Sequence, residues 1–528
     1  MLQLPDLRIS DNMSLTLGVA ACVGVIGTIV WVYLRKSDSR LPLPPSPPTW
    51  RVRGHFLLPH EPFLTVARWI DEYGPLITIR SGMQNMVIIG RYKAAVDIME
   101  KQGRTLADRP RAVAGGEIIT RGLDLAFCHV GDRLRRLRRV LHTHLQPKSA
   151  EMYQPLQMSQ AGAVILNILD DPSNFQNHAI TYAAATILKV AYGKTSPTSA
   201  ADPEVREARR LMSRLRVVMR PGAYWVESIP WLKYLPWYAP ELRDDFKRVR
   251  KLHTDQLTRV KLHMQRNEDI GPSFSRYILE NGHLYDLTEM EMAYLCGSFF
   301  GAGTETTATA ICTVLMAAAH FPEEQAKVQA ELDAVIGRER APTFADKPSL
   351  PHLEAFISEV SRWRPLAPFG EFLDGRSCAD VHTVHPTGFP HRTTEDVIWE
   401  NYCIPAGTTV FGNHWAISRD PEVYPEPGAF KPQRWIDEQG RLRDDLTFFV
   451  YGFGRRVCPG QHVANRSVFI NSLLILWAFQ LSLDPTKPQD DMGFTNTSMP
   501  NVPCAIEFQA RVPEVELRRM MQNYPGAG

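Results

Sequence analysis

The chain has 528 residues, of which 44% are apolar, and its 59 basic and 57 acidic residues leave a net charge of only +2. A balance this close to neutral excludes the basic surface that nucleic-acid-binding proteins need, so we expect no nucleic-acid partner. Eight cysteines occur without a Cys-x-x-Cys pair, which argues against zinc fingers, iron–sulfur clusters and a disulfide framework and favours a reducing compartment.

The first element in chain order is an apolar segment near the N-terminus. Leu15 to Leu34 spans twenty residues without a formal charge, enough to cross a hydrocarbon core of about 30 Å as a helix. Arg35 and Lys36 follow it, and positive residues stay on the cytosolic side of a membrane. We therefore predict a transmembrane anchor at 15–34, with residues 1–14 in the lumen. A cleaved signal peptide is the alternative, although its apolar core is shorter, roughly 7 to 15 residues, and follows its basic residues.

A basic, proline-rich hinge is predicted at 35–48. The run from Leu41 to Pro48 holds five prolines, which exclude helix and sheet and favour a stiff extended spacer. Beyond the hinge no Gly/Ser tract, charge block or repeat marks a domain boundary. Residues 49–512 are therefore predicted to form one large cytosolic unit, followed by a C-terminal tail at 513–528.

Aromatic side chains crowd the segment between Pro221 and Pro240. Aromatic amphiphiles favour the headgroup zone of a bilayer, so this segment is a candidate for a second contact with membrane lipid. Ordinary packing in the protein core is the alternative interpretation. The aromatic residues are Tyr224, Trp225, Trp231, Tyr234, Trp237 and Tyr238.

Three stretches place polar or charged residues on predicted helices. Tyr294 to Ala319 is apolar and rich in alanine and threonine, as in a buried helix, yet it contains Gly301-Ala-Gly-Thr-Glu-Thr-Thr307. Small residues there let a helix backbone pass close over a flat group. Glu359 and Arg362 share one helix face and can form a charge-assisted pair. The basic run 133–139 is interpreted, in the simplest case, as a solvated or membrane-facing patch.

Cys458 lies in the run Tyr451-Gly-Phe-Gly-Arg-Arg-Val-Cys-Pro-Gly460. A lone thiolate needs positive neighbours to stay ionised and glycines that let backbone N–H groups approach its sulfur, which is what an axial haem ligand requires. A buried cysteine in a glycine-rich turn is the alternative. The run therefore predicts Cys458 as the ligand of a haem iron.

This run resembles the haem-binding loop of the cytochrome P-450 monooxygenases. The family pattern is Phe-x-x-Gly-x-Arg-x-Cys-x-Gly, matched here by Tyr451, Gly454, Arg456, Cys458 and Gly460. Tyr451 replaces the family's phenylalanine and adds a hydroxyl that needs a partner. The resemblance covers about residues 40 to 512. Within the family, the chain resembles fungal microsomal enzymes of secondary metabolism. It implies a mainly α fold with a small β region, the cytochrome P-450 fold, preceded here by one N-terminal transmembrane helix in the endoplasmic reticulum membrane.

The resemblance also implies roles for individual residues. The stretch 302–307 looks like the oxygen-activating motif, in which Glu305 and Thr306 are catalytic and deliver protons. Arg138, His391 and Arg456 would bind the haem propionates, with Leu134 where the family has a tryptophan. Glu359, Arg362 and Arg434 would form a buried salt-bridge triad, although Gln433 and Trp435 depart from the common form of that motif. The candidate substrate pocket consists of Phe299, Phe300, Ala302, Leu366 and Phe369.

The stretch 371–388 interrupts two segments that are nearly continuous in related sequences. It shows no clear helical or strand period, so it is predicted to be an insertion. One hypothesis is a retained intron, because Gly370-Glu371 and Thr387-Gly388 can be encoded by splice-site sequences and removal of the stretch keeps the reading frame. A tolerated surface loop is the alternative.

The expected reaction is transfer of one oxygen atom from O2 to an apolar secondary metabolite, a terpenoid in our preferred reading, by hydroxylation or epoxidation. No flavin- or nicotinamide-binding motif is evident, so electrons from NADPH must arrive from a separate protein. The resemblance implies NADPH-cytochrome P-450 reductase, with cytochrome b5 as a second donor, docked on Arg455 and exposed members of 133–139. Two alternatives stay open: a haem-thiolate isomerase or dehydratase that needs no O2, and a haem sensor without turnover.

Overall fold

The computed structural model describes residues 23–24, 27, 41–49, 54–55, 62–81, 84–219, 223–268, 271–366, 389–487 and 505–525. The predicted anchor at 15–34 lies outside the described residues except for positions 23, 24 and 27, and the predicted insertion at 371–388 and Phe369 lie wholly outside them. Among the residues that are described, no helix has the length and apolar character needed to cross a membrane.

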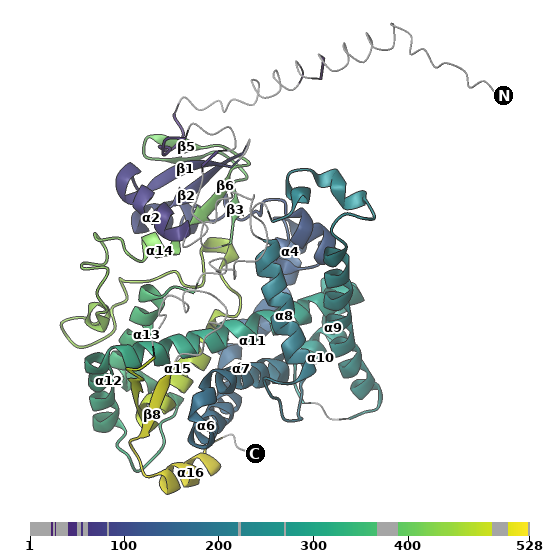
Figure 1. Cartoon of the computed structure of the whole chain (residues 1–528). Coiled ribbons are helices and arrows are strands. Elements are labelled where there is room, and N and C mark those ends of the chain that lie inside the picture. The colour runs from purple at the N-terminus through teal and green to yellow at the C-terminus, as the bar shows by residue number, and fades with distance from the viewer. Residues whose placement is uncertain are drawn as a thin grey trace, which may run out of the picture.

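Helices make up most of the described chain, which confirms the prediction of a mainly α fold (Figure 1). The α-helices are α2 (Pro62–Tyr73), α3 (Tyr92–Ala94), α4 (Asp132–Leu145), α5 (Pro147–Glu151), α6 (Gln154–Asp170), α7 (Phe175–Tyr192), α8 (Pro203–Val218), α9 (Pro240–Gln265), α10 (Phe274–Asn281), α11 (Glu289–His320), α12 (Pro322–Val335), α13 (Pro351–Trp363), α14 (His414–Ile417), α15 (Gln461–Ala478) and α16 (Glu514–Gln522). Short π-helical segments cover Ala95–Glu100 and Val113–Ile119. Single 3₁₀ turns include Leu125–Phe127, Trp225–Glu227, Pro230–Tyr234, Pro432–Trp435 and Gly454–Arg456.

The helix α11 runs through the middle of the helical part and organises it (Figure 1). It begins at a capping box, in which the Thr288 hydroxyl accepts from the N–H of Glu291 at 3.2 Å and the Glu291 carboxylate accepts from the N–H of Thr288 at 3.1 Å. Helices α7, α8, α9 and α15 pack against it. Because α11 is apolar on nearly every face, burial all round is what its composition predicts.

The β region is small, as expected from the sequence. Its main sheet has the order β1-β2-β6-β3, with β2 and β6 parallel and the outer pairs antiparallel. Two hairpin-like pairs, β4 with β5 and β7 with β8, complete it. The strands are β1 (Leu76–Ser81), β2 (Gln84–Ile89), β3 (His391–Arg392), β4 (Val397–Trp399), β5 (Tyr402–Ile404), β6 (Thr409–Gly412), β7 (Phe479–Leu483) and β8 (Ile506–Ala510).

The described part of the proline-rich hinge, residues 41–48, contains neither helix nor strand and lies against the sheet region. The carbonyl of Pro45 accepts from the N–H of Thr78 at 2.7 Å, and the carbonyl of Pro42 accepts from the N–H of Cys403 at 2.9 Å. Prolines lack a backbone donor but keep their carbonyls, and these carbonyls serve as the acceptors here. This docking fixes where the chain enters the globular part.

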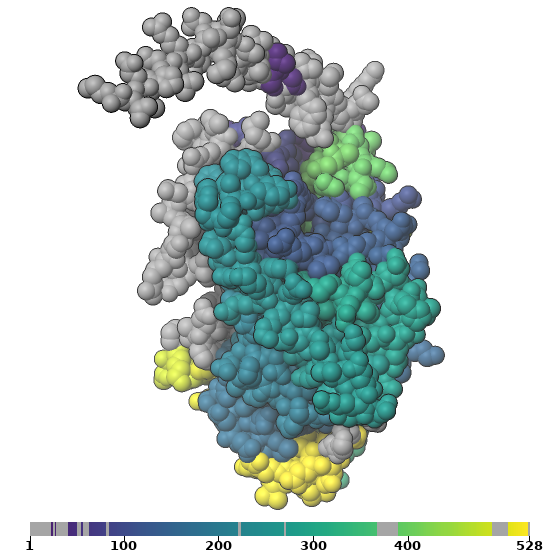
Figure 2. All heavy atoms as spheres, turned by 90° about the vertical axis from the view of Figure 1, so that its right-hand side faces the viewer, coloured from purple at the N-terminus to yellow at the C-terminus, as the bar shows by residue number. Residues whose placement is uncertain are grey.

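The aromatic segment between α8 and α9 protrudes from the molecule. Its four most exposed rings, Trp225, Trp231, Tyr234 and Trp237, are 60% to 75% exposed. The alternative interpretation, packing in the protein core, is therefore wrong for these four side chains. Figure 2 shows the segment, in teal, at the same end of the molecule as the light-green pair β4 and β5.

Candidate haem-thiolate site

Cys458 lies between the 3₁₀ turn Gly454–Arg456 and the first turn of α15. Burial raises the pKa of its thiol, and three features oppose that shift: the backbone N–H groups of Gly460 and Gln461 and the positive charge of Arg138. The start of an 18-residue helix adds partial positive charge at the same place. These features offset part of the effect of burial, and they are the ones that stabilise the thiolate, the form of cysteine that binds a metal.

Gly454 of this loop is required by close packing of the backbone. A Cβ at Gly454 would lie 2.7 Å from the carbonyl oxygen of Met99, and its φ of +52° lies in the left-handed region. Its N–H donates to the Glu100 carboxylate at 2.7 Å. The hydroxyl of Tyr451 donates to the side-chain oxygen of Asn465 at 2.6 Å, which is the partner that the extra hydroxyl required.

Three arginines gather at this loop: Arg109 and Arg456, which are buried, and Arg138, which is half-buried. Arg138, on α4, donates to the carbonyl of Val457 at 2.9 Å, and Arg456 donates to the carbonyl of Ala107 at 2.6 Å. Burial and mutual repulsion lower the pKa of Arg109 to about 9, and burial is the main cause that lowers the pKa of Arg456 to about 10. In the described part of the chain none of the three pairs with a carboxylate.

His391, on β3, joins this group from the sheet side. Its Nδ1 lies 2.8 Å from the carbonyl oxygen of Leu106. Burial, with the nearby charges of Arg109 and Arg456, lowers its pKa to about 3, so the ring is neutral at pH 7. Four side chains from four separate segments thus present positive charge and N–H groups to one region, which the sequence predicted for three of them.

One stripe along the middle of α11 is more accessible than the buried residues around it. Ala302 is exposed and Thr306 and Ala310 are half-buried, and these residues follow one another at intervals of four. Residues four apart lie on the same face of a helix. The Thr306 hydroxyl donates to the carbonyl of Ala302 at 2.7 Å. We call the unfilled space in front of this stripe the internal space.

Gly303 lies on a different side of α11 and is required there by packing. A Cβ at this position would lie 2.7 Å from Cδ1 of Ile187 on α7. The helix is continuous at this residue. The structure therefore explains this glycine by the close contact between α7 and α11.

Glu305 does not share the accessible stripe with Thr306. Its carboxylate is buried and lies 3.3 Å from Arg216 and 3.7 Å from Arg209, both on α8. Successive helical residues differ by about 100° in direction, which separates the two side chains. The predicted catalytic pair is therefore split in this arrangement: Thr306 borders the internal space and Glu305 ties α11 to α8.

The predicted substrate-pocket residues divide into three groups. Ala302 is exposed, while Phe299 and Leu366 are half-buried. Phe300 is fully buried and its ring meets Tyr192 of α7 edge-on, so its assignment to the pocket was wrong. The physical reason is again the helical turn, which directs Phe300 away from the stripe at Ala302.

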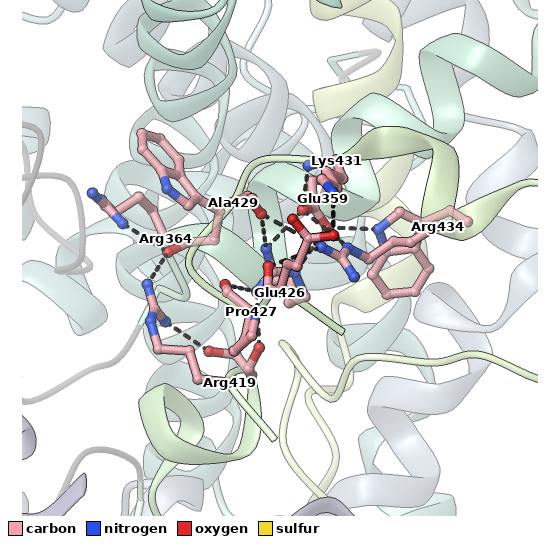
Figure 3. Close-up of polar contacts among 12 residues, drawn as sticks. Glu359, Arg364, Arg419, Glu426, Pro427, Ala429, Lys431 and Arg434 are labelled. Carbon is pink, nitrogen blue, oxygen red and sulfur yellow. Dashed lines mark hydrogen bonds and ion pairs between the residues drawn. The ribbon is translucent and has the colours of Figure 1, made fainter. Parts of the chain in front are cut away.

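The structure brings Glu359, Arg362 and Arg434 together (Figure 3). Arg362 forms two bonds with the Glu359 carboxylate, at 2.6 and 2.8 Å, and Nε of Arg434 lies 3.2 Å from it. The remaining donors of Arg362 reach three backbone carbonyls, and the carboxylate also accepts from the backbone N–H of Lys431 at 2.7 Å. Such a fully hydrogen-bonded pair braces α13 against the turn Pro432–Trp435.

The sequence analysis did not predict the contacts of two residues in these clusters. Nε1 of Trp435 donates to the Glu359 carboxylate at 2.9 Å, so the departure from the family's phenylalanine adds a bond. Arg109 lies in the chain before α4 and donates to the carbonyl of Pro390 at 2.5 Å. A lone arginine next to a proline carries no periodic signal, whereas the tryptophan could have been suspected from its buried N–H donor.

Comparison with known proteins places the chain in a family. The family model "Cytochrome P450" matches residues 44–372 and 381–508. "Cytochrome P450 monooxygenase 113" of Postia placenta is 43% identical over 95% of this chain and 98% of its own length, and a cytochrome P450 monooxygenase of Armillaria gallica is 33% identical over 83% of each chain. A zebrafish cytochrome P450 structure with progesterone matches with a TM-score of 0.66 at 23% identity, over 85% of this chain and 99% of the zebrafish chain. This likeness shows that the two proteins share a fold.

The chain therefore belongs to the cytochrome P450 family, and it is a cytochrome P450 monooxygenase that uses haem b. The residues present fit that cofactor. Three arginines that form no ion pair within the described residues suit the two propionates of haem, and the thiol of Cys458 sits where N–H groups and a helix start stabilise its anion. The accessible stripe at Ala302 leaves a helix face open to a flat group.

Proposed function

We propose that this enzyme is anchored in the endoplasmic reticulum membrane and oxidises an apolar secondary metabolite, with O2 and with electrons that a reductase takes from NADPH. The observation that carries the proposal is the accessible stripe Ala302, Thr306 and Ala310 on a largely buried helix. It offers an apolar surface with a single hydroxyl, which suits a reaction at an unactivated C–H bond or an alkene. Hydroxylation and epoxidation are the two outcomes.

Bound haem supplies the iron chemistry that reduces O2 and transfers one oxygen atom to the substrate. Cys458 holds the iron, and Arg109, Arg138, Arg456 and His391 hold the propionates. Thr306 can turn its hydroxyl from the Ala302 carbonyl toward the internal space and position a proton there. Glu305 conducts protons toward that space when its arginine partners on α8 release it.

Attachment to the membrane is supported by the exposed apolar side chains at one end of the molecule. Besides the exposed tryptophans of the aromatic segment, Leu41 and Leu43 of the hinge and Ile398 of β4 are exposed there. Aromatic rings favour the headgroup zone and aliphatic side chains the acyl region. An anchor at 15–34 would enter the membrane next to this face, with the haem site in the cytosol.

The electron donor would dock on the side of the cysteine loop. Arg455 is exposed beside Cys458, and Arg135 and Arg139 are exposed on α4. NADPH-cytochrome P450 reductase, and cytochrome b5 as a second donor, would meet this face with carboxylates. Among apolar substrates we favour a terpenoid, since the accessible stripe contains small aliphatic residues.

The stretch 371–388 is proposed to be a retained intron. In support, the family match is interrupted between residues 372 and 381, inside that stretch. Sequencing of the transcript tests this: a mature messenger that lacks the eighteen codons supports the intron, and one that retains them in cells with active enzyme contradicts it.

The function is tested by microsomal expression with a reductase. We expect a thiolate-type Soret band from the reduced protein with carbon monoxide, and NADPH-dependent formation of oxygenated products from a panel of apolar substrates. Haem binding without NADPH consumption would instead indicate a sensor, and conversion of substrate without O2 would indicate an isomerase or dehydratase. Thr306→Ala should lower the product formed per NADPH by about tenfold or more. Thr304→Ala is the matched control, because the Thr304 hydroxyl makes the same kind of bond, to Phe300, but is buried away from the stripe.

A further inference from the structure

An acidic side chain stands at the end of the accessible stripe on α11. Asp124 precedes the 3₁₀ turn Leu125–Phe127, and its carboxylate accepts from the N–H of Ala126 at 2.8 Å and from the hydroxyl of Ser298 at 3.0 Å. Ser298 lies on α11 four residues before Ala302, so both point to the same side of that helix. The carboxylate is therefore on the side of α11 that borders the internal space.

The surroundings of Asp124 are interior rather than surface. Burial raises the pKa of its carboxyl, and the hydrogen bonds from Ala126 and Ser298 oppose that shift. Nevertheless residues 122–127 are all half-buried, so this stretch keeps accessible surface. The Asp124 carboxyl is thus desolvated, while the stretch that carries it is not fully covered by protein. In the described part of the chain no ion pair includes Asp124.

A purely structural role explains only part of this arrangement. Asp124 caps a single turn and links the segment before α4 to α11, and serine or asparagine would do the same without burying an acid. Each carboxylate oxygen accepts one bond and has a second lone pair. An acid buried without a cation is costly, and a hydrogen-bond donor from a ligand would offset that cost.

We propose that Asp124 binds a hydroxyl group of the substrate and so fixes which end of an apolar molecule reaches Thr306. The inference rests on the proposed function, because Thr306 marks where oxidation occurs. Ser298 and Thr306 are eight residues apart, about 12 Å along a helix at 1.5 Å per residue. The substrate is thus an apolar skeleton with a hydroxyl about two helical turns from the carbon that is oxidised. A hydroxyl suits the site better than an ammonium group, because a second buried charge adds its own desolvation cost.

The test uses ligands that are held at both ends. An imidazole ring coordinates haem iron and shifts the Soret band, so 1-imidazolyl alkanols of increasing chain length place a hydroxyl at increasing distances from the iron. Matched 1-imidazolyl alkanes of the same length lack the hydroxyl. We expect one alkanol length to bind about tenfold tighter than its alkane, a ratio that corresponds to one hydrogen bond to a charged group. Shorter and longer alkanols should show a ratio near one.

Variants assign that preference to Asp124. In Asp124→Ser the ratio should fall to about one, since a serine can still cap Ala126 but its shorter side chain withdraws from the ligand. Asp124→Asn retains a carbonyl oxygen and should keep part of the preference. Ser298→Ala is the matched control: it removes a competing donor and should leave the ratio equal or larger. The band of the reduced protein with carbon monoxide verifies that each variant is folded around haem.

The outcomes separate this inference from the function on which it rests. If imidazolyl alkanes shift the Soret band but no alkanol of any length binds tighter than its alkane, the role of Asp124 is wrong and the haem site stands. The role is also wrong if Asp124→Ser keeps the wild-type ratio. If neither series shifts the band and the carbon monoxide spectrum is absent, the proposed function itself has failed.

Discussion

The structure contains two groups of arginines that differ in what accompanies them. Arg362 and Arg434 surround the carboxylate of Glu359, which lies at the centre of Figure 3. Among the described residues, Arg109, Arg138 and Arg456 donate to backbone carbonyls, and repulsion among these three side chains contributes to the lowered pKa of Arg109. The first group is complete within the protein itself. The second carries positive charge that the nearby carboxylate of Asp108 offsets only in part, and a bound anion would offset the rest, which distinguishes a ligand site from a structural brace.

Cys458→Ser should have the largest effect, because it removes the ligand around which the second group is arranged. We expect complete loss of the thiolate-type band with carbon monoxide and of product formation. Cys128→Ser is the matched control, since Cys128 is also buried and its carbonyl accepts from Arg456. An oxidation rate that survives Cys458→Ser would contradict the assignment of the iron ligand.

Glu359→Gln should disrupt the first group by leaving Arg362 and Arg434 without their counter-charge. Removing one partner of a buried pair costs about 3 to 5 kcal/mol, so the free energy of unfolding should fall by that amount in denaturant titrations, with and without haem. Glu354→Gln, on the same helix, alters a partly exposed pair with Lys347 and should cost about 1 kcal/mol or less. Equal losses in the two variants would mean that the buried carboxylate is not the brace we describe.

Arg109→Met should have the opposite pattern of effects, with little change in the stability of the apoprotein and a loss of haem affinity. It therefore sharpens the comparison of the two groups. In the haem-free protein the charge of Arg109 is disfavoured, as its pKa of about 9 indicates, and its loss should offset the cost of two unpaired carbonyls. We expect the unfolding free energy of the apoprotein to change by about 1 kcal/mol or less, and haem affinity to fall about tenfold. Transfer of haem to a scavenger protein measures the second quantity. A large loss of apoprotein stability with unchanged haem affinity would make Arg109 a structural residue.

What the sequence could predict depended on whether the relevant residues lie close together in the chain. Cys458 with its glycines, and Glu359 with Arg362, belong to local patterns whose chemistry can be interpreted without a fold. Arg109 was missed because its neighbours Pro390 and Arg456 are brought to it only by folding.

The error at Phe300 has a different physical origin. A helix that is buried on nearly every face shows no contrast between its sides, so the sequence of α11 could not indicate which aromatic residue points toward the stripe at Ala302. The separation of Glu305 from Thr306 was missed for the same reason. Fold class was predictable because it required only the family resemblance and the length of the helical patterns.

Trp435→Phe should have the smallest effect, and it tests whether the first group is complete without the tryptophan. The variant restores the residue common in the family and removes one bond to the Glu359 carboxylate, which keeps its bonds from Arg362, Arg434 and Lys431. We expect a loss of about 1 kcal/mol in unfolding free energy, at the lower end for a bond to a charged group. A double-mutant cycle with Glu359→Gln isolates the interaction, because the tryptophan should matter less once the charge is gone. An equal cost in both backgrounds would mean that ring volume, rather than the indole N–H, sets the contribution of Trp435.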